Sequence, residues 1–478
     1  MRKPLLVTLL ALLASGCMVG PDYVRPPVDT PAGWRLSEQD ARDLANTAWW
    51  EQLGDPVLND LVTTALRENK DLMIAAARVE EFAGNYGFVH SGLFPQVGAG
   101  YDARRQRDVS AVVIGAGGGQ TYNSYNAVLN ASWEIDIWGR IRRQTEAARA
   151  QLLASEEGRR GVILSLVGSV AGAYTNLRNL DRQLEIARAT AKSRGESYEL
   201  FKLRFEGGII SVLELSQNRS QYEEALATIP PLEKAIAQQE NGLSVLLGRN
   251  PGPILRGKTI DQLTLPAIPA GLPSELLERR PDIRRAEQNL VAANALIGAA
   301  KAAYFPTISL TGLFGYSSTS LSNLFNSQNK VWNYGSPISM PIFTAGAIAG
   351  QVQAAEASQQ QALFAYQKAI QEAFREVNDS LISQDRTREQ LKVQKRQVEA
   401  LQQYSATARL RYDNGYTSYI EVLDAERSLF NVQLQYTQTQ QVEFQAMINL
   451  YLAMGGGWVS EAEKVTDAVA RTDPGVAQ

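Results

Sequence analysis

The sequence of 478 residues predicts a mixed α and β membrane protein with an internal duplication. This prediction depends on three observations. Two stretches of more than sixty residues have helical periodicity and contain no proline. Shorter segments alternate apolar and polar residues, as β-strands do. Pairs of similar motifs recur in the same order in both halves of the chain.

The chain begins like an exported lipoprotein. Two basic residues precede an apolar run over 5–13, and small residues follow at 14–16. The run is too short to span a bilayer and is typical of a signal peptide. Cys17, the only cysteine, follows directly and is expected to carry a covalent lipid, with an incidental cysteine as the alternative. Met18 after it favours the outer membrane as the destination.

Two pairs of motifs indicate the duplication. The segment "GFVHSGLFPQV" at 87–97 resembles "GAAKAAYFPTI" at 298–308, with a shift of 211 residues. The segment "LRFEGGIISVLELSQ" at 203–217 resembles "LRYDNGYTSYIEVLD" at 410–424, with a shift of 207. We therefore divide the chain into a signal peptide (1–16), a lipidated N-terminal segment (17–55), a first repeat (56–250), a linker (251–280), a second repeat (281–455) and a C-terminal tail (456–478).

Each repeat is expected to begin with one helix, which continues to a Phe-Pro pair. Asp55 can cap a helix that starts at Pro56, and Pro281 begins the equivalent helix. Strands follow, and the alternation is clearest at 121–137 and 331–342. Alternation of this kind is typical of barrel strands between lipid and water, although a half-buried strand of a soluble sandwich looks the same.

The strands are followed by long helices. At about 1.5 Å per residue, the proline-free runs at 140–205 and 351–414 give helices roughly 100 Å long. Apolar residues step by three and four in the first run, and a seven-residue frame predicts supercoiling in the second. A coiled-coil rod would have no place for the strands. The frame of the second run consists of Leu363, Ile370, Val377, Gln384, Leu391 and Val398, with Gln384 as its polar break.

Four strands are too few to close a barrel, and unpaired strand edges are costly in hydrocarbon. Self-association would solve this problem. Three copies would supply twelve strands, and the helices would extend the same cylinder away from the membrane.

The composition argues against several classes of function. The net charge of −3 gives no basic surface for nucleic acid. One cysteine and one histidine cannot build a cysteine-based or multi-histidine metal site. Because the sequence also has no nucleophile–base pair or cofactor motif, we expect no enzyme activity, no metal and no cofactor other than the lipid on Cys17.

Taken together, several segments resemble the outer-membrane factors of tripartite efflux and export systems, the TolC-like family, in particular its OprM-like lipoprotein branch. They span nearly the whole mature chain in the family's order. They are "CMVGPDYVRP" at 17–26, "WWEQLGDPVLNDLVTTALRENKDLMIAAARV" at 49–79, "WEIDIWGRIRRQTEAARA" at 133–150, "ERRPDIRRAEQNLVAANALIGAAKAAYFPTISL" at 278–310, "MPIFTAGAI" at 340–348 and "YDNGYTSYIEVLDAERSLF" at 412–430.

The resemblance implies a homotrimer, with a twelve-stranded outer-membrane β-barrel continuous with a long periplasmic α-helical barrel. It implies a passive, gated conduit for small molecules, anchored by lipid in the outer membrane and extending into the periplasm. The implied partners are a periplasmic adaptor, outer-membrane lipid and an inner-membrane pump, most often a proton-driven resistance-nodulation-division transporter. The sequence does not specify the cargo.

The resemblance also implies a gate where paired helices turn at the periplasmic tip. Tyr412, Ile420, Asp424 and Arg427 match positions that constrict the entrance or latch neighbouring helices. Glu421 shares a helix face with Asp424 and Arg427, and threefold symmetry would make rings of these charges. Ile420 would be an apolar plug, and Asp424 with Arg427 a breakable ionic latch. A solvated helix face would show the same charges.

The first repeat has matching tip positions at Ser211 and Glu214. The turns are expected near Gly208 and Gly415, where glycine supplies positive φ. Thr417 occupies a position where the TolC branch has a latch arginine, so that bond is absent here.

Two other functions compete with small-molecule efflux. One is the outlet of a type I protein-secretion system, which has the same architecture. The other is a lipid-anchored coiled-coil scaffold, which would also use heptads and a lipid but would not form a compact trimeric barrel.

Overall fold

The computed structural model describes residues 18–28, 48–108, 120–266, 276–455 and 459. The chain divides into two compact units, and each unit combines segments from both repeats. No helix in the described ranges is long and apolar enough to cross a bilayer. The strand unit lies within residues 1–27, 78–156 and 285–367, and the tip unit lies within residues 28–77, 157–284 and 368–478.

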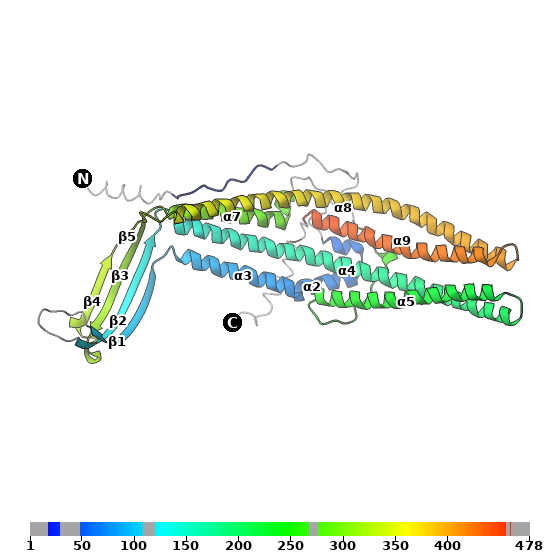
Figure 1. Ribbon diagram of the computed structural model, residues 1–478, viewed down its shortest axis with the longest axis horizontal. Coiled ribbons are helices and arrows are strands. Elements are labelled where there is room, and N and C mark those ends of the chain that lie inside the picture. Colours follow the sequence, from blue (N-terminus) through cyan, green and yellow to red (C-terminus); the bar gives the residue numbers. More distant parts are fainter. Residues whose placement is uncertain (1–17, 29–47, 109–119, 267–275, 456–458, 460–478) are drawn as a thin grey trace. The chain divides into compact units, whose positions relative to one another are not determined.

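The helices confirm the predicted duplication, because three pairs have equal lengths (Figure 1). The members of each pair are related by the sequence shifts of 211 or 207 residues. The pairs are α3 (Lys70–Ser91) with α7 (Pro281–Ala302), both of 22 residues, α4 (Arg140–Glu206) with α8 (Ala347–Asp413), both of 67, and α5 (Val212–Leu246) with α9 (Tyr419–Ala453), both of 35.

The first repeat does not begin with the single helix that the sequence predicted. Helix α2 (Pro56–Glu68) ends at Asn69, whose extended backbone (φ −63°, ψ 129°) separates it from α3. The Asn69 carboxamide accepts a hydrogen bond from the Leu72 N–H at 3.0 Å and donates to the Leu246 carbonyl at 2.9 Å. Asparagine therefore caps a new helix here, because its side chain satisfies a free backbone donor. The short helices are η1 (Trp49–Leu53), η2 (Ile260–Gln262), α6 (Leu276–Arg279), η4 (Leu321–Asn323) and η5 (Ser327–Asn329).

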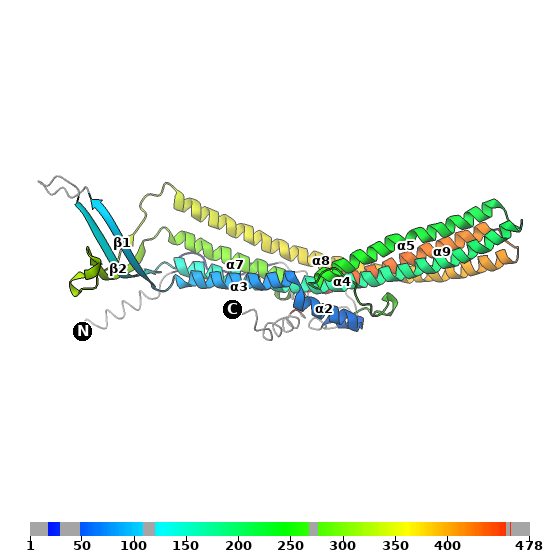
Figure 2. The same ribbon diagram turned by 90° about the horizontal axis from the view of Figure 1, so that it is seen from below.

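The strand unit contains one antiparallel sheet with the strand order β1-β2-β3-β4 (Figure 1), and Figure 2 shows β1 and β2 of this sheet from below. The predicted strand at 331–342 is split, because Pro337 lacks a backbone donor and interrupts the pairing with β3. The outer edges of β1 and β4 have no partner strand among the described residues. The strands are β1 (Gln96–Asp108), β2 (Gln120–Ile135), β3 (Thr307–Ser318), β4 (Lys330–Gly335) and β5 (Ile338–Ser339).

The two faces of this sheet differ in polarity, as predicted. Antiparallel partners lie on the same face. The register therefore joins the apolar positions of all four strands into one surface, which is largely exposed in the single chain. The opposite face carries Ser, Asn, Thr and charged side chains. The apolar face includes Val97, Tyr101, Ala127, Leu129, Trp133, Leu310, Phe314, Trp332 and Tyr334.

The seven-residue frame predicted for α8 corresponds to a buried seam. Ile370, Val377, Gln384 and Leu391 of the frame are all buried. A second buried row lies three residues after each of them, as expected for helices that supercoil. This seam becomes polar toward the end of the helix. The second row consists of Ala373, Ser380, Thr387 and Gln394.

The described start of the segment predicted as a linker (251–280), residues 251–266, contacts α2 and α4 through Asp55. The buried Asp55 carboxylate accepts hydrogen bonds from Val57 N at 3.0 Å, Lys258 N at 2.8 Å and the Tyr174 hydroxyl at 2.6 Å. The first of these bonds is the helix cap predicted from the sequence. One carboxylate thus holds α2, α4 and this segment together.

Candidate functional site

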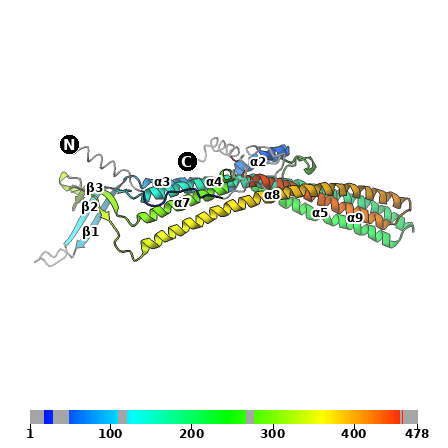
Figure 3. The same cartoon turned by 90° about the horizontal axis from the view of Figure 1, so that it is seen from above.

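The predicted turns are present at the ends of α4 and α8, and their backbones match. Gly208 and Gly415 have φ values of 71° and 76°, which glycine adopts without steric cost. The Ile209 N–H donates to the Arg204 carbonyl at 2.9 Å, and the equivalent bond in the second turn has the same length. These bonds satisfy carbonyls that would otherwise be unpaired at the helix ends. Figure 3 shows the two turns at the same end of the tip unit.

The two turns differ in how the following helix is capped. Ser211 and Glu214 form a reciprocal capping box, in which the Glu214 carboxylate accepts from Ser211 N at 2.9 Å. Ser418 occupies the same place before α9 but makes no side-chain capping bond. Glu421 therefore takes part in no capping box, in contrast to Glu214. The first-repeat tip residues serve the local helix start, whereas the second-repeat carboxylate stays on the helix surface.

An aromatic cluster joins the two hairpins beneath the turns. The Tyr419 ring lies 4.4 Å from that of Phe201 and 5.1 Å from that of Tyr412, measured between centroids. Asn218 donates to the Tyr419 hydroxyl at 2.5 Å, and burial raises the pKa of Tyr419. Tyr412, predicted to constrict the entrance, is half-buried against this cluster in the single chain.

The other predicted gate residues lie together on α9. Ile420, Glu421, Asp424 and Arg427 line a groove of about 500 Å³, and 56% of Ile420 is exposed. An apolar side chain and three charged groups thus share one open surface. The remaining lining residues come from α5, α8 and α9, and they are Gln217, Ser220, Gln221, Tyr404 and Leu423.

Asp424 and Arg427 form the predicted ion pair. Arg427 Nη2 lies 3.1 Å from Asp424 Oδ1, and both side chains are about half exposed. Both residues belong to α9, so within one chain this pair connects no two helices. The pair therefore shows no latch between helices in the single chain, and the roles of these residues as a gate stay predictions.

Sequence reasoning missed a second charged group inside the tip bundle. The buried Arg194 guanidinium donates to the Gln221 carbonyl at 2.8 Å and lies 5.3 Å from the centre of the Phe430 ring. Burial lowers the pKa of Arg194 and raises that of Glu426, although the nearby positive charges of Arg409 and Arg194 oppose the shift of Glu426. Arg194 continues the three-and-four spacing of the buried seam on α4. An arginine at a position where the spacing predicts an apolar residue was the signal in the sequence that could have identified this buried group.

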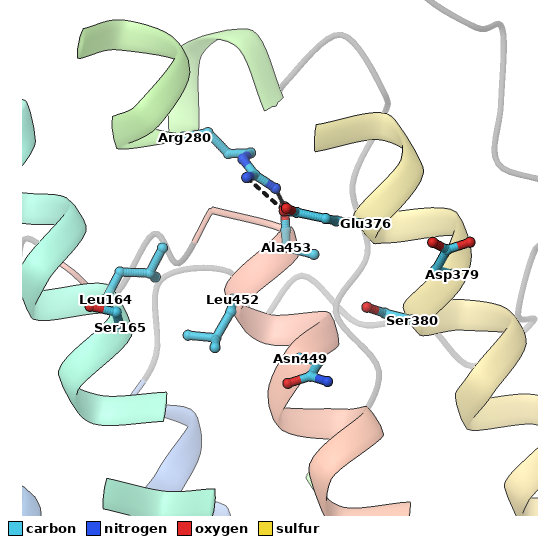
Figure 4. A pocket seen from close by; sticks show the side chains of 9 residues that line it. All are labelled: Leu164, Ser165, Arg280, Glu376, Asp379, Ser380, Asn449, Leu452 and Ala453. Atoms are coloured by element: carbon cyan, nitrogen blue, oxygen red, sulfur yellow. Dashed lines mark hydrogen bonds and ion pairs between the residues drawn. The ribbon is translucent and has the colours of Figure 1, made fainter. Parts of the chain in front are cut away.

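A second groove, of about 400 Å³, contains a buried arginine (Figure 4). Arg280 pairs with Asp282 at 2.7 Å and with Glu376 at 2.8 Å, and it donates to the Ala453 carbonyl at 3.0 Å. Burial opposes both charges, but the bonds to Arg280 lower the pKa of Asp282. This arginine joins the start of α7 to α8 and to the end of α9. The groove is otherwise lined by Leu164, Ser165, Asp379, Ser380, Asn449 and Leu452.

The predicted lipid acceptor, Cys17, lies outside the described residues, but the segment after it is docked in the strand unit. Val19 N donates to the Trp138 carbonyl at 3.1 Å. The buried Arg143 pairs with Asp22 at 2.7 Å, and the Tyr23 hydroxyl donates to Glu287 at 3.1 Å. The start of the described chain is thus fixed where β2 leads into α4.

A two-faced sheet and paired helical hairpins are the parts expected of an outer-membrane channel subunit, and the comparisons with known proteins decide the class. The chain matches the family "Outer membrane efflux protein" over residues 61–249 and 272–456. It is 37% identical over 470 residues to the toluene efflux pump outer membrane protein TtgF of Pseudomonas putida, covering 96% of this chain and 98% of that protein. It is also 37% identical over 463 residues to the cation efflux system protein CusC of Escherichia coli, covering 95% and 98% of the two chains.

The same likeness holds for solved structures. The open state of the MtrE outer membrane channel of Neisseria gonorrhoeae superimposes with a TM-score of 0.82 at 32% identity. The match covers 92% of this chain and 99% of that chain. The chain therefore belongs to the outer membrane efflux protein family. It is the outer-membrane channel component of an efflux system, and the predicted fold class and outer-membrane location are confirmed.

Proposed function

We propose that three copies of this chain close one twelve-stranded barrel and one helical conduit. The observation that carries this proposal is the sheet of the strand unit, whose β1 and β4 edges have no partner among the described residues. Exposed backbone groups in hydrocarbon cost several kcal/mol each, so both edges need a neighbour. Pairing of β1 with β4 of the next copy satisfies every edge when the ring closes.

Electrophoresis tests this assembly directly. The detergent-extracted protein is expected to migrate as a compact trimer without heating. After boiling it should migrate as a single chain below the 52.4 kDa of the whole sequence, because the signal peptide has been removed. Mass measurement by light scattering gives an independent value. A monomeric mass in mild detergent, with identical migration before and after boiling, would contradict the proposal and favour a lipid-anchored scaffold.

The partners follow from the passive nature of such a conduit. We infer that a periplasmic adaptor joins the trimer to an inner-membrane pump of the resistance-nodulation-division type, which supplies the energy. The relatives are described as outlets for toluene and for cations, so their cargo varies on one fold. We therefore propose small toxic solutes as cargo, with selection made by the pump.

A lipid on Cys17 is proposed as the membrane anchor. The support is its position, one residue before a segment that docks where β2 leads into α4. Acyl chains attached there would enter the membrane leaflet next to the helix end of the barrel.

The α9 surface is proposed as the gate. Asp424→Ala with Arg427→Ala removes both charges of the half-exposed pair, and we expect the single-channel conductance of the reconstituted trimer to rise about twofold or more. In the proposed trimer, three such pairs form a ring around the entrance and hold neighbouring chains together there. Without these charges the contacts between chains are weaker, so the entrance opens more easily.

The matched control is Arg386→Ala with Glu389→Ala, because this exposed pair has the same spacing in reverse order on α8. We expect the control to leave the conductance unchanged. Equal conductances of the wild-type protein and the α9 double variant would remove the latch from this proposal.

A further inference from the structure

Charged side chains from both hairpins of the tip unit lie close together. The first hairpin is α4 with α5, and the second is α8 with α9 (Figure 1). The side chain of Arg194 on α4 is 4% exposed, that of Arg409 on α8 is 32% exposed, and that of Glu426 on α9 is 29% exposed. We call these three residues the inner charge cluster. The other charged or titratable groups around it are Glu224 of α5, Asp413 of α8 and Tyr419 of α9.

Glu426 lies on the face of α9 that packs on the first hairpin. Val422 and Phe430, four residues before and after it, are buried, and residues four apart share a helix face. The Phe430 ring contacts α4, because its centre lies 5.3 Å from the guanidinium carbon of Arg194. The ion pair predicted as a latch lines the open groove instead. Helix α9 therefore carries one charged group inside the tip and another on its surface.

The guanidinium of Arg194 is buried with too few partners. Its Nη1 donates to the Gln221 carbonyl at 2.8 Å, but Nε and Nη2 have no hydrogen-bond partner among the described residues. The Nη1 atom lies 3.6 Å from the Glu224 carboxylate, and 46% of that side chain is exposed. A buried charge whose donors stay unpaired loses more on leaving water than its contacts return. Packing of the tip is therefore unfavourable for Arg194.

The carboxylate of Glu426 is in a similar position. Arg409 Nη1 lies 3.9 Å from Glu426 Oε1, and no donor in the described part of the chain hydrogen-bonds this carboxylate. Arg409 is shared, because its Nε also lies 3.6 Å from the Asp413 carboxylate. Burial raises the pKa of Glu426, and the charges of Arg409 and Arg194 reverse this shift only in part.

These shifts determine which state of the tip each charge favours. A carboxyl whose pKa is higher in the packed tip than in water binds its proton more tightly in the packed tip. Acid therefore favours packing around Glu426, whereas at neutral pH its charge favours contact with water. Burial also lowers the pKa of Arg194, against the charges of Glu224 and Glu426, so the charged arginine is likewise more stable in water.

From this geometry, we propose that Arg194 and Glu426 are positioning residues that favour separation of α9 from the first hairpin. Separation hydrates both side chains and moves the surface of α9 that carries the proposed gate. The inner charge cluster and the latch thus act in opposite directions, and protonation of Glu426 shifts the balance toward the closed entrance. The inference rests on the proposed gate, since a movement of α9 changes conductance only if its outer surface surrounds the entrance.

The single-channel conductance of the reconstituted trimer, measured at about pH 7.5 and about pH 5.5, tests this role. The wild-type protein is expected to conduct about twofold or more better at the higher pH, where Glu426 is charged. Glu426→Gln cannot acquire this charge, so it should show the lower conductance at both pH values. Glu426→Asp keeps a titrating carboxyl and should keep the pH dependence.

Glu443→Gln is the matched control. Glu443 is also a glutamate of α9 whose pKa is raised by burial, against the charge of Arg388, but it lies far from the turn. Its replacement should leave the conductance and the pH dependence unchanged. Glu421 and Asp424 also lose charge in acid, but they do so in the wild-type protein and in both glutamine variants. The difference between these proteins therefore measures the contribution of Glu426.

Thermal unfolding in detergent gives a second test that does not depend on the gate. Arg194→Met removes two buried donors without partners and keeps an unbranched side chain beside Phe430, while Arg409 still lies beside Glu426. We expect the unfolding midpoint to rise by about 2 °C or more. Arg188→Met is the control and should leave the midpoint unchanged, because 60% of the Arg188 side chain is exposed.

Several results would overturn this role. They are a conductance of Glu426→Gln that equals or exceeds the wild-type value at both pH values, and a lower unfolding midpoint for Arg194→Met. A glutamine variant that does not assemble would also contradict it, because the neutral side chain is expected to pack better than the charged one.

The latch variant separates this inference from the gate. If Asp424→Ala with Arg427→Ala raises the conductance while Glu426→Gln does not lower it, the gate stands and the inner charge cluster has no part in it. If neither variant changes the conductance, the gate itself is wrong, and the inference fails with it.

Discussion

Replacing Asp55 with alanine is expected to give the largest loss of stability among single substitutions in the tip unit, about 3–5 kcal/mol. The change removes the α2 cap and leaves Lys258 N and the Tyr174 hydroxyl without their acceptor. The Tyr174 hydroxyl is a donor at neutral pH because the ordinary tyrosine pKa is about 10, and burial raises this pKa further. A buried donor without an acceptor costs more than the bond itself contributed.

The measurement is the midpoint of thermal unfolding, followed by circular dichroism in detergent. Asp60→Ala is the matched control, since Asp60 is an exposed aspartate of α2. Asp55→Asn should fall between the two, because an amide oxygen can still accept from Val57 N. A midpoint for Asp55→Ala within about 2 °C of the Asp60→Ala value, which is the size of the experimental scatter, would show that this junction contributes little.

The second large effect is expected for Arg280→Met, which should cost about 2–3 kcal/mol. It leaves the Ala453 carbonyl and two carboxylates without their donor. The cost is smaller than for Asp55 because 41% of the Asp282 side chain and 43% of the Glu376 side chain are exposed and can be rehydrated. Arg284→Met is the control, because Arg284 forms an ion pair with Glu157 but 42% of its side chain is exposed.

The stabilisation by the Arg280–Asp282 ion pair is expected to depend on pH. The pKa of Asp282 is lowered in the folded protein, so its contribution is present above the ordinary aspartate pKa of about 4. It is lost as the pH falls through the lowered folded value. The difference in unfolding midpoint between the wild-type protein and Arg280→Met should therefore be large at pH 7 and shrink below about pH 4. A difference that grows in acid would refute this assignment.

The sequence predicted those features that depend on local patterns. Period-two alternation predicted β2 and the region of β4 and β5 with their faces, whereas β1 and β3 were not located by it. The seven-residue frame predicted the buried seam of α8, including Gln384. The glycines at 208 and 415 marked both turns because positive φ is costly for other residues. The break at Asn69 was missed, because asparagine inside a helical pattern signals a cap only when its long-range partner at Leu246 is known.

The candidate site was predicted less completely than the fold. The spacing of Asp424 and Arg427 predicted their contact, since residues three apart meet on a helix. No local pattern shows that Ser418 leaves its helix uncapped while Ser211 does not, because both are followed by glutamate at the third position. The burial of Arg194 and Glu426 depends on four helices that are distant in sequence, so the tertiary packing determines their pKa shifts.

The division of the chain has a consequence for its biogenesis. Each compact unit draws on segments from both repeats, so neither unit can be completed from the first half alone. During export, the strands and helices of the first repeat cannot pack fully until their partners, about 210 residues later in the chain, have also been translocated. Long-range closure of this kind is slow and leaves apolar surface open to aggregation. This polypeptide is therefore expected to depend on periplasmic chaperones until its last long helices have been translocated.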